Sequence, residues 1–231
     1  MVGSFDFSNR VSLVCLSQPS ATTDCHSAEQ LVAYTARVSN PANQNNTKTA
    51  SKLLGYLIKE NHWSPLEMVH CTMSITTTRD ISRQILRHRS FSFQEFSQRY
   101  AVSENVGVER EARLQDTTNR QNSVELEDNA EDRHLGHEWF RIQSRVRWMA
   151  KKEYQIALDL GIAKEQARAL LPEGLTETTL YMAGSLRSWI HYCELRMANG
   201  TQKEHIDIAK QCWDILGTHF PDIIKAVENK D

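Results

Sequence analysis

The stretch VHCTMSITT, residues 69 to 77, decides the fold because apolar and polar side chains alternate along it. Its apolar positions are Val69, Cys71, Met73 and Ile75, and the positions between them are His70, Thr72, Ser74 and Thr76. Successive side chains of a β-strand point to opposite faces, so this pattern predicts a strand with one buried face. The residues that follow, 77–80, predict a helix that begins in a capping box and buries Ile81 and Ile85.

Helical spacing dominates the chain on both sides of this strand. Before it we expect a strand over 10–17, a helix capped by Ser27, a loop over 41–47 and a helix over 47–61. After it we expect a long amphipathic helix ending at Gly161, a short helix over 164–171, a strand over 176–182, a helix from the cap Ser185 to Met197, and a helix over 203–219. The predicted fold class is therefore α+β, with mixed helices and a small antiparallel sheet.

Length and composition predict one domain over residues 1–231, with a polar, mobile excursion or insertion around 103–137. The net charge of −2 argues against a protein that coats nucleic acid. Five scattered cysteines, no apolar leader and no apolar run of membrane-spanning length predict a cytoplasmic protein without a membrane partner. The nine histidines show no convincing metal-binding spacing, so we expect no metal.

The segment RQILRHRSFSFQEFSQRY, residues 83–100, is rich in arginine and has Glu95 as its one carboxylate. Arg79, Arg83 and Arg87 are spaced to share one helix face, where their guanidinium groups would suit a phosphate. An ordinary solvated face with loose ion pairs is the alternative. The serines and amides that follow, interleaved with aromatic rings, would suit a heteroaromatic base, although most of the phenylalanines are better read as core.

A second candidate lies on the predicted helix that begins after Ser185. Arg196 continues the apolar stripe of that helix, so either a buried partner meets its charge or its side chain extends outward to solvent. Arg187 and His191, four residues apart, lie on another face of this predicted helix and could also bind a ligand. The chain has neither a glycine-rich phosphate loop nor a recognisable nucleophile motif, which favours chemistry carried by an organic cofactor.

These residues resemble the signature of the flavin-dependent thymidylate synthases, Arg-His-Arg-x-x-Ser-x-Asn-Glu-x-Ser-x-Arg-Tyr. The chain matches it over residues 87–100, with Gln94 where the pattern has Asn. The blocks ARVSN (36–40), HWSPLE (62–67), ARALLP (167–172), SLRSWIHYCELR (185–196) and TQKEH (201–205) also resemble the family, in the same order. Met68 and Ser185 stand where many members have His and Asn.

The resemblance implies an α+β homotetramer with active sites between subunits that methylates dUMP to dTMP. Methylenetetrahydrofolate would donate the carbon, and NADPH would reduce a bound FAD. By resemblance FAD would contact Ser64, Arg87, His88, Arg89, Glu95, Ser185, Arg187 and His191, with His62 on the flavin or folate side. The nucleotide dUMP would contact Gln84, Arg87, Glu95, Phe96, Ser97, Gln98, Arg99, Arg168 and Arg196. Arg196 would be catalytic, facing the uracil and favouring its ionisation at N3.

Two other functions stay open on the sequence. The first is a degenerate family member that binds FAD and dUMP without turnover, for which residues 68, 94 and 185 give the only grounds. The second is a non-catalytic nucleotide- or RNA-binding module built on the basic, aromatic segment. The near-neutral net charge argues against the second.

Overall fold

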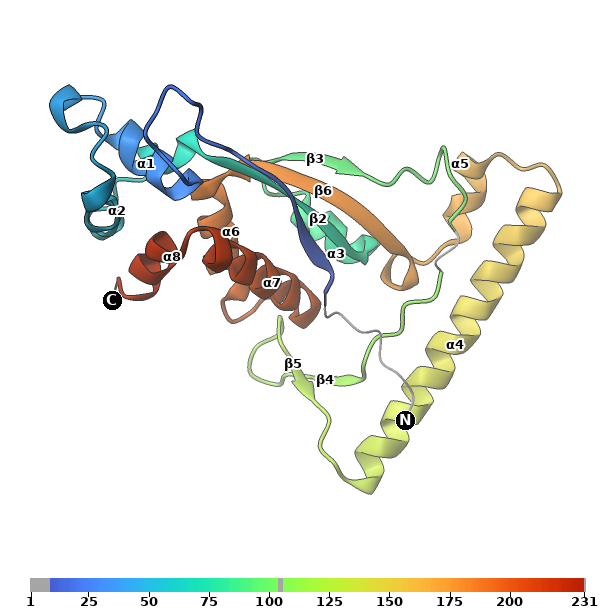
Figure 1. Cartoon of the computed structure of the whole chain (residues 1–231). Helices are drawn as coiled ribbons and strands as arrows, with labels where there is room; N and C mark the ends of the chain where they lie inside the picture. Colours follow the sequence, from blue (N-terminus) through green and yellow to red (C-terminus); the bar gives the residue numbers. More distant parts are fainter. Residues whose placement is uncertain (1–8, 104–105, 231) are drawn as a thin grey trace.

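The computed structural model describes residues 9–103 and 106–230 (Figure 1). Its strands are β1 (Val11–Leu16), β2 (His70–Thr78), β3 (Ser92–Glu95), β4 (Arg113–Gln115), β5 (Ser123–Glu125) and β6 (Glu177–Ser185). Its α-helices are α1 (Ala28–Ala36), α2 (Ala50–Lys59), α3 (Arg79–Ile85), α4 (Ala130–Asp159), α5 (Lys164–Ala167), α6 (Leu186–Met197), α7 (Lys203–His219) and α8 (Pro221–Glu228). Short 3-10 turns cover Pro41–Asn43, Thr47–Thr49, Ser64–Met68, Arg168–Leu170 and Glu173–Leu175.

Four strands form an antiparallel sheet in the order β1-β2-β6-β3, which confirms the α+β class. β2 and β6 are its long central pair, in register from His70 opposite Ser185 to Thr78 opposite Glu177. Helices α6 and α7 pack on one face of this sheet (Figure 1). The C-terminal end of β6 therefore delivers the chain directly into α6.

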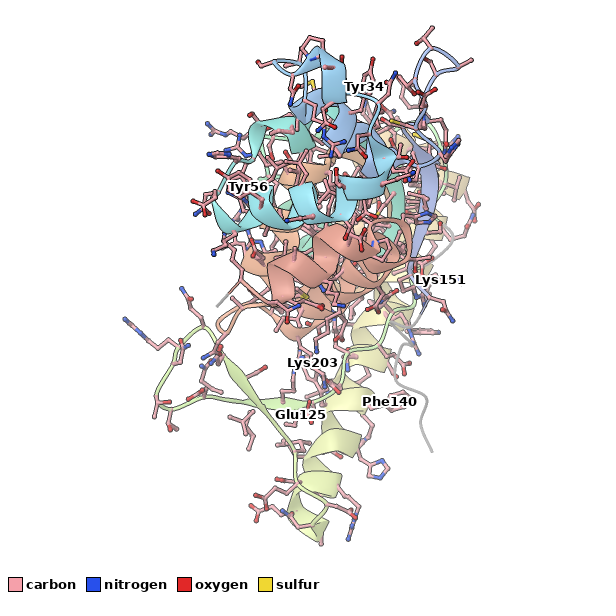
Figure 2. All side chains as sticks on the ribbon, turned by 60° about the vertical axis from the view of Figure 1, so that its left-hand side comes forward. Tyr34, Tyr56, Glu125, Phe140, Lys151 and Lys203 are labelled. Carbon is pink, nitrogen blue, oxygen red and sulfur yellow. The ribbon has the colours of Figure 1, made fainter. Side chains whose placement is uncertain are left out.

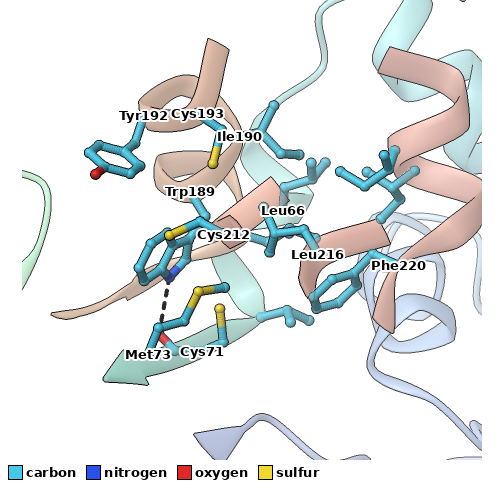
Figure 3. Packing of buried hydrophobic residues seen from close by; sticks show 14 of the residues in the cluster. Leu66, Cys71, Met73, Trp189, Ile190, Tyr192, Cys193, Cys212, Leu216 and Phe220 are labelled. Carbon is cyan, nitrogen blue, oxygen red and sulfur yellow. Dashed lines mark hydrogen bonds between the residues drawn. The ribbon is translucent and has the colours of Figure 1, made fainter. Parts of the chain in front are cut away.

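The alternation in β2 is confirmed. Cys71, Met73 and Ile75 are at most 2% exposed, whereas the residues between them face the open side of the sheet. The buried side packs against the apolar stripe of α6, which includes Trp189 (Figure 3). The indole Nε1 of Trp189 donates to the carbonyl of Cys71 at 3.1 Å, so this large buried ring keeps its polar atom satisfied.

The predicted caps of two helices are also confirmed. The Ser27 hydroxyl accepts from the backbone N–H of Gln30 at the start of α1. The Ser185 hydroxyl accepts from the N–H of Ser188 at the start of α6. Each cap satisfies a helix-start N–H that has no partner within the helix.

The capping box at residues 77–80 is wrong. Thr77 lies within β2, and Thr78 is the N-cap of α3 but makes no side-chain cap bond; its hydroxyl donates instead to Asp80. The stack of three arginines is also wrong, because α3 ends at Ile85 and Arg87 lies beyond it. The chain turns there through bonds from the N–H groups of residues 87 and 88 to carbonyls three positions earlier.

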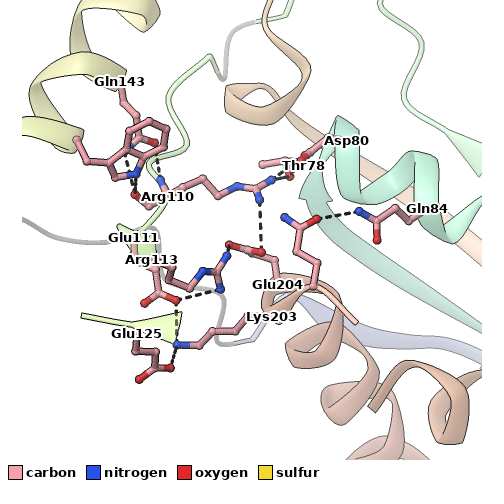
Figure 4. A network of polar contacts seen from close by, with 12 residues as sticks. Thr78, Asp80, Gln84, Arg110, Glu111, Arg113, Glu125, Gln143, Lys203 and Glu204 are labelled. Atoms are coloured by element: carbon pink, nitrogen blue, oxygen red, sulfur yellow. Dashed lines mark hydrogen bonds and ion pairs between the residues drawn. The ribbon is translucent and has the colours of Figure 1, made fainter. Parts of the chain in front are cut away.

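The polar stretch 103–137, of which residues 104 and 105 lie outside the described part, contains the β4–β5 hairpin and the first turns of α4. Ion pairs tie this hairpin to the start of α7. Lys203 binds Glu125, and the two face each other between hairpin and helices (Figure 2). Arg113 binds Glu204, which Arg110 also approaches at 3.4 Å (Figure 4). The carboxylate of Glu204 is buried, and these cations hold it in its charged form.

Helix α4 is 30 residues long and runs beside the sheet-and-helix body (Figure 1). The structure confirms the predicted long helix and its end, since Gly161 follows it with φ +82°. Tyr154 near its C-terminal end is buried, but the apolar stripe before it is exposed: Val146 is 46% exposed and Met149 is 50% exposed. A contiguous exposed apolar stripe of this kind is typical of a surface that interacts with another molecule.

Phe91 fixes the loop that carries residues 87–89 against the sheet. A Cβ built on Gly184 of β6 would lie 2.4 Å from Cδ1 of the Phe91 ring, so only glycine lets the ring lie on the strand. The same ring meets Trp189 edge-on, with centroids 4.9 Å apart. The lack of a side chain at Gly184 therefore lets Phe91 hold the loop against β6.

We expect Gly184→Ala to lower the free energy of unfolding by about 1–3 kcal/mol, because the added methyl group forces the Phe91 ring to move. Urea denaturation measures this change. Gly55→Ala in α2 is the control: a Cβ there meets nothing within 4 Å, and alanine favours a helix by up to about 1 kcal/mol. A Gly184→Ala protein as stable as wild type would contradict the packing described here.

Candidate active site

Arg196 and His88 form the central contact of the site. Arg196 lies in the last turn of α6, and its Nε donates to Nε2 of His88 at 2.8 Å. The guanidinium is half-buried, and its two terminal nitrogens have no partner among residues 9–103 and 106–230. The partner that the apolar stripe of α6 required is therefore the imidazole of His88.

The contact fixes the protonation of His88. Arginine can only donate, so the Nε2 that accepts carries no hydrogen, and the neutral ring carries its hydrogen on Nδ1. Burial first, and then the charge of Arg196, lower the pKa of His88 to about 4. His88 is thus a neutral acceptor at pH 7, with its Nδ1–H left as a donor.

A buried polar chain adjoins this pair. The His88 ring meets Tyr192 edge-on at 4.9 Å between centroids. The Tyr192 hydroxyl lies 3.1 Å from Nε2 of His205, and Nδ1 of His205 lies 3.2 Å from Oε1 of Gln84. Gln84, predicted from the resemblance to bind nucleotide, thereby joins residues of α6 and α7 that the sequence analysis did not select.

Glu95 is the acceptor of a second group of contacts. Its Oε1 accepts from Ser82 at 2.8 Å and from Thr178 at 3.1 Å, and Arg79 lies 3.8 Å away. Arg79 is 8% exposed and also donates to the carbonyl of Phe96 at 3.4 Å. The carboxylate therefore holds β3, which was not predicted, against α3.

A cavity of about 410 Å³ lies beside this group, and further residues predicted to bind the nucleotide line it. Gln98 and Arg168 line it together with Arg79 and Arg83. Some of its charge is balanced: Arg83 binds Glu173 at 3.0 Å, and Arg99, next to Gln98, binds Glu165 at 3.4 Å. Arg168, whose Nε donates to the carbonyl of Glu165, has no carboxylate within ion-pair distance among the described residues.

Three predicted cofactor contacts, Ser185, Arg187 and His191, lie at the start or in the first half of α6. Ser64 lies in the 3-10 turn Ser64–Met68 that packs against α6, and His62 lies just before that turn. Arg187 pairs at 2.9 Å with Glu67, the last residue of the HWSPLE block. Hydrogen bonds from Ser185 and then Arg187 hold the pKa of Glu67 below its usual value. The His191 ring meets Trp63 at 4.7 Å between centroids, and His62 meets Tyr56 at 5.9 Å.

Arg87 and Arg89 flank His88, and both are exposed. In the part of the chain that the structure describes, neither has a carboxylate within ion-pair distance. Two free guanidinium groups two residues apart suit a diphosphate, which each can bind through a fork of N–H donors. The loop therefore fits the diphosphate of a dinucleotide cofactor.

Tyr192 and His205 were not predicted from the sequence as functional residues. His205 continues the stripe of Ile208, Cys212 and Leu216 on α7, all at most 1% exposed. A histidine on a fully buried stripe requires polar partners, and this pattern was the available signal. The partners themselves come from other elements and could not be read from spacing.

The neutral state of His88 makes stability depend on pH. Between pH 6.5 and about 4 the unfolded chain binds a proton that folded His88 does not, so stability falls as pH falls through this window. His88→Asn retains an acceptor for Arg196 but cannot titrate. We expect this variant to lower the slope of the unfolding free energy against pH by at most about 1.4 kcal/mol per pH unit. The change is smaller for this half-buried ring, because solvent screens its charge.

Urea denaturation between pH 4.5 and 7.5, at constant protein concentration, measures that slope. His137→Asn changes an exposed histidine and serves as the control. If His88→Asn leaves the slope of the wild type intact, His88 is not held neutral by burial and Arg196.

Comparison with known proteins places this chain in a family. Residues 21–222 match the family described as thymidylate synthase complementing protein. The chain is 48% identical, over 94% of its length and 97% of the relative, to a probable flavin-dependent thymidylate synthase of Paramecium bursaria Chlorella virus 1. It is 47% identical, over 94% of its length and 99% of the relative, to the flavin-dependent thymidylate synthase of Synechocystis sp..

A solved structure is similar as well. The UMP/dUMP methylase PolB from Streptomyces cacaoi, bound with 5-Br dUMP, superimposes with a TM-score of 0.78 at 26% identity, over 95% of this chain and 94% of that one. Both comparisons extend over most of the chain, and the matched residues 21–222 include the segment 87–100. The chain belongs to the flavin-dependent thymidylate synthase family.

Proposed function

We propose that this protein methylates dUMP to dTMP, with methylenetetrahydrofolate as carbon donor, NADPH as reductant and FAD as bound cofactor. The observation that carries the proposal is the Arg196–His88 contact, which holds a cation in a partly desolvated position with its terminal N–H groups unpaired in the described part of the chain. Such a cation stabilises a negative charge that develops on a bound ring better than one in water does.

In this proposal the chain binds and orients the reactants. Arg196 donates to the uracil and favours its ionisation at N3, and His88 holds the guanidinium in place. The nucleotide is bound by Gln84, Arg87, Phe96, Ser97, Gln98, Arg99 and Arg168. FAD is bound by Ser64, Arg87, His88, Arg89, Ser185, Arg187 and His191, with His62 at its edge and Glu95 between the two ligands. When bound, FAD supplies the hydride that completes the methyl group.

The cysteines support a route without a thiol nucleophile. Burial raises the pKa of Cys71 to about 12, and it raises that of Cys193 well above its usual value. Cys212 is fully buried beside them, and burial raises its pKa too. A protonated, enclosed thiol is a poor nucleophile, so these three cysteines are not available to attack a pyrimidine.

We further propose a homotetramer whose active sites lie between subunits. The exposed apolar face of α4, with Val146 and Met149, supports an interface with other copies of the chain. The separation of the predicted site residues into three groups supports completion of one site by residues of several subunits. We also propose a cytoplasmic location, which the five free thiols support because disulfides are rare in that compartment. No described helix is long and apolar enough to cross a bilayer.

Tritium release from dUMP labelled at C5 tests the function. With methylenetetrahydrofolate present, we expect release that requires both FAD and NADPH. Release that needs neither would contradict the flavin route. A folded, flavin-loaded protein that releases no tritium would support a degenerate, binding-only member, and salt-dependent polynucleotide binding without flavin would support the RNA-binding alternative.

Two arginine variants separate nucleotide activation from flavin binding when turnover and retained flavin are both measured. Arg196→Ala should slow turnover at least tenfold while flavin absorbance stays, because its proposed target is the uracil. Arg89→Ala should lower flavin retention first, because its proposed target is the diphosphate. Loss of flavin in Arg196→Ala would show that Arg196 is misassigned.

A further inference from the structure

A series of three hydrogen bonds runs from the core through Gln84 to Gln202. It links Tyr192 to His205 at 3.1 Å, His205 to Gln84 at 3.2 Å, and Gln84 to Gln202 at 2.9 Å. Tyr192 is 1% exposed and His205 is 0% exposed, whereas Gln84 is half-buried. The series therefore begins in the core and includes, at Gln84, a side chain that a ligand can reach.

The direction of each hydrogen bond follows from chemistry. Oε1 of Gln84 can only accept, so Nδ1 of His205 carries the hydrogen and donates. Nε2 of the neutral ring must then accept, and the Tyr192 hydroxyl is its donor. Reversing the Gln84 amide would reverse every bond and leave the Tyr192 hydrogen without an acceptor among the described residues, at a buried position where that loss is costly.

His205 stays neutral, so this direction is stable. Burial first, then the charge of Arg196, then His88, lower the pKa of His205 to about 3. Neutral imidazole carries one hydrogen, and Tyr192 determines which nitrogen holds it. Oε1 of Gln84 faces His205, and the NH2 group gives one hydrogen to Gln202 and keeps the second for a ligand.

Stability alone does not require a tyrosine–histidine pair here. Two apolar side chains of similar shape would fill the same space and leave no buried polar atom to satisfy, an exchange that is close to neutral when both partners change. The pair does supply a fixed orientation of Gln84. That side chain lies on α3, three residues before Arg87.

We propose that Tyr192 and His205 are positioning residues that orient the Gln84 amide as a hydrogen-bond donor to the pyrimidine nucleotide. Neither touches the nucleotide; both act through Gln84. The inference rests on the proposed function, because it takes dUMP as the ligand of Gln84.

The test is the dissociation constant of dUMP for the flavin-loaded protein, measured by calorimetry. Tyr192→Phe removes the hydroxyl and keeps the ring. We expect it to weaken dUMP binding about threefold to tenfold, the range for one weakened neutral hydrogen bond, with flavin content unchanged. Tyr34→Phe, on the half-buried Tyr34 of α1, is the control and should leave binding unchanged.

A double-mutant cycle distinguishes positioning from a structural role. In the Gln84→Ala background, Tyr192→Phe should cost nothing further, because the amide that it orients is gone. The same loss in both backgrounds, or no loss in either, would overturn the inference. If Tyr192→Phe fails to fold, the double variant Tyr192→Phe/His205→Leu replaces both polar partners and takes its place in the cycle.

The experiment also separates this inference from the function on which it rests. A wild-type protein that does not bind dUMP refutes both. A wild-type protein that binds dUMP, and a Tyr192→Phe protein that binds it equally well, refutes the positioning role alone.

Discussion

The site depends on one hydrogen bond, from the guanidinium of Arg196 to the neutral imidazole of His88. A partly buried arginine normally takes a carboxylate as its partner, and that partner would neutralise its charge. A neutral histidine satisfies Nε, holds the side chain and leaves the positive charge uncompensated. A base that becomes anionic during the reaction can then use that charge.

The rest of the fold holds the two ends of this bond. Arg196 stands on α6, which begins at the Ser185 cap where β6 ends, so the central sheet sets the direction of the helix. His88 stands on a loop that Phe91 pins against β6 at Gly184. Helix α7 contributes His205, which binds the Tyr192 hydroxyl next to the site. The ion pairs of Glu204 hold the same end of α7 to Arg110 and Arg113.

Local patterns in the sequence predicted much of this arrangement. The alternation of 69–77, the Ser185 cap and the bounds of α7 depend on neighbouring residues only, and the structure confirms them. The end of α3 before Arg87 was not predicted, because β3 draws the chain away by pairing with β6. The partners of Arg196 and Gln84 lie 108 and 121 residues away along the chain, beyond the reach of any spacing argument.

The protonation state of His88 at pH 7 tests the account most directly. Nitrogen NMR of protein labelled with ¹⁵N-histidine reports the hydrogen on each ring nitrogen, and the His88→Asn variant assigns the signal. We expect a bare Nε2 that accepts from Arg196 and a hydrogen on Nδ1. A His88 ring with a hydrogen on both nitrogens, or with its hydrogen on Nε2, would contradict the account.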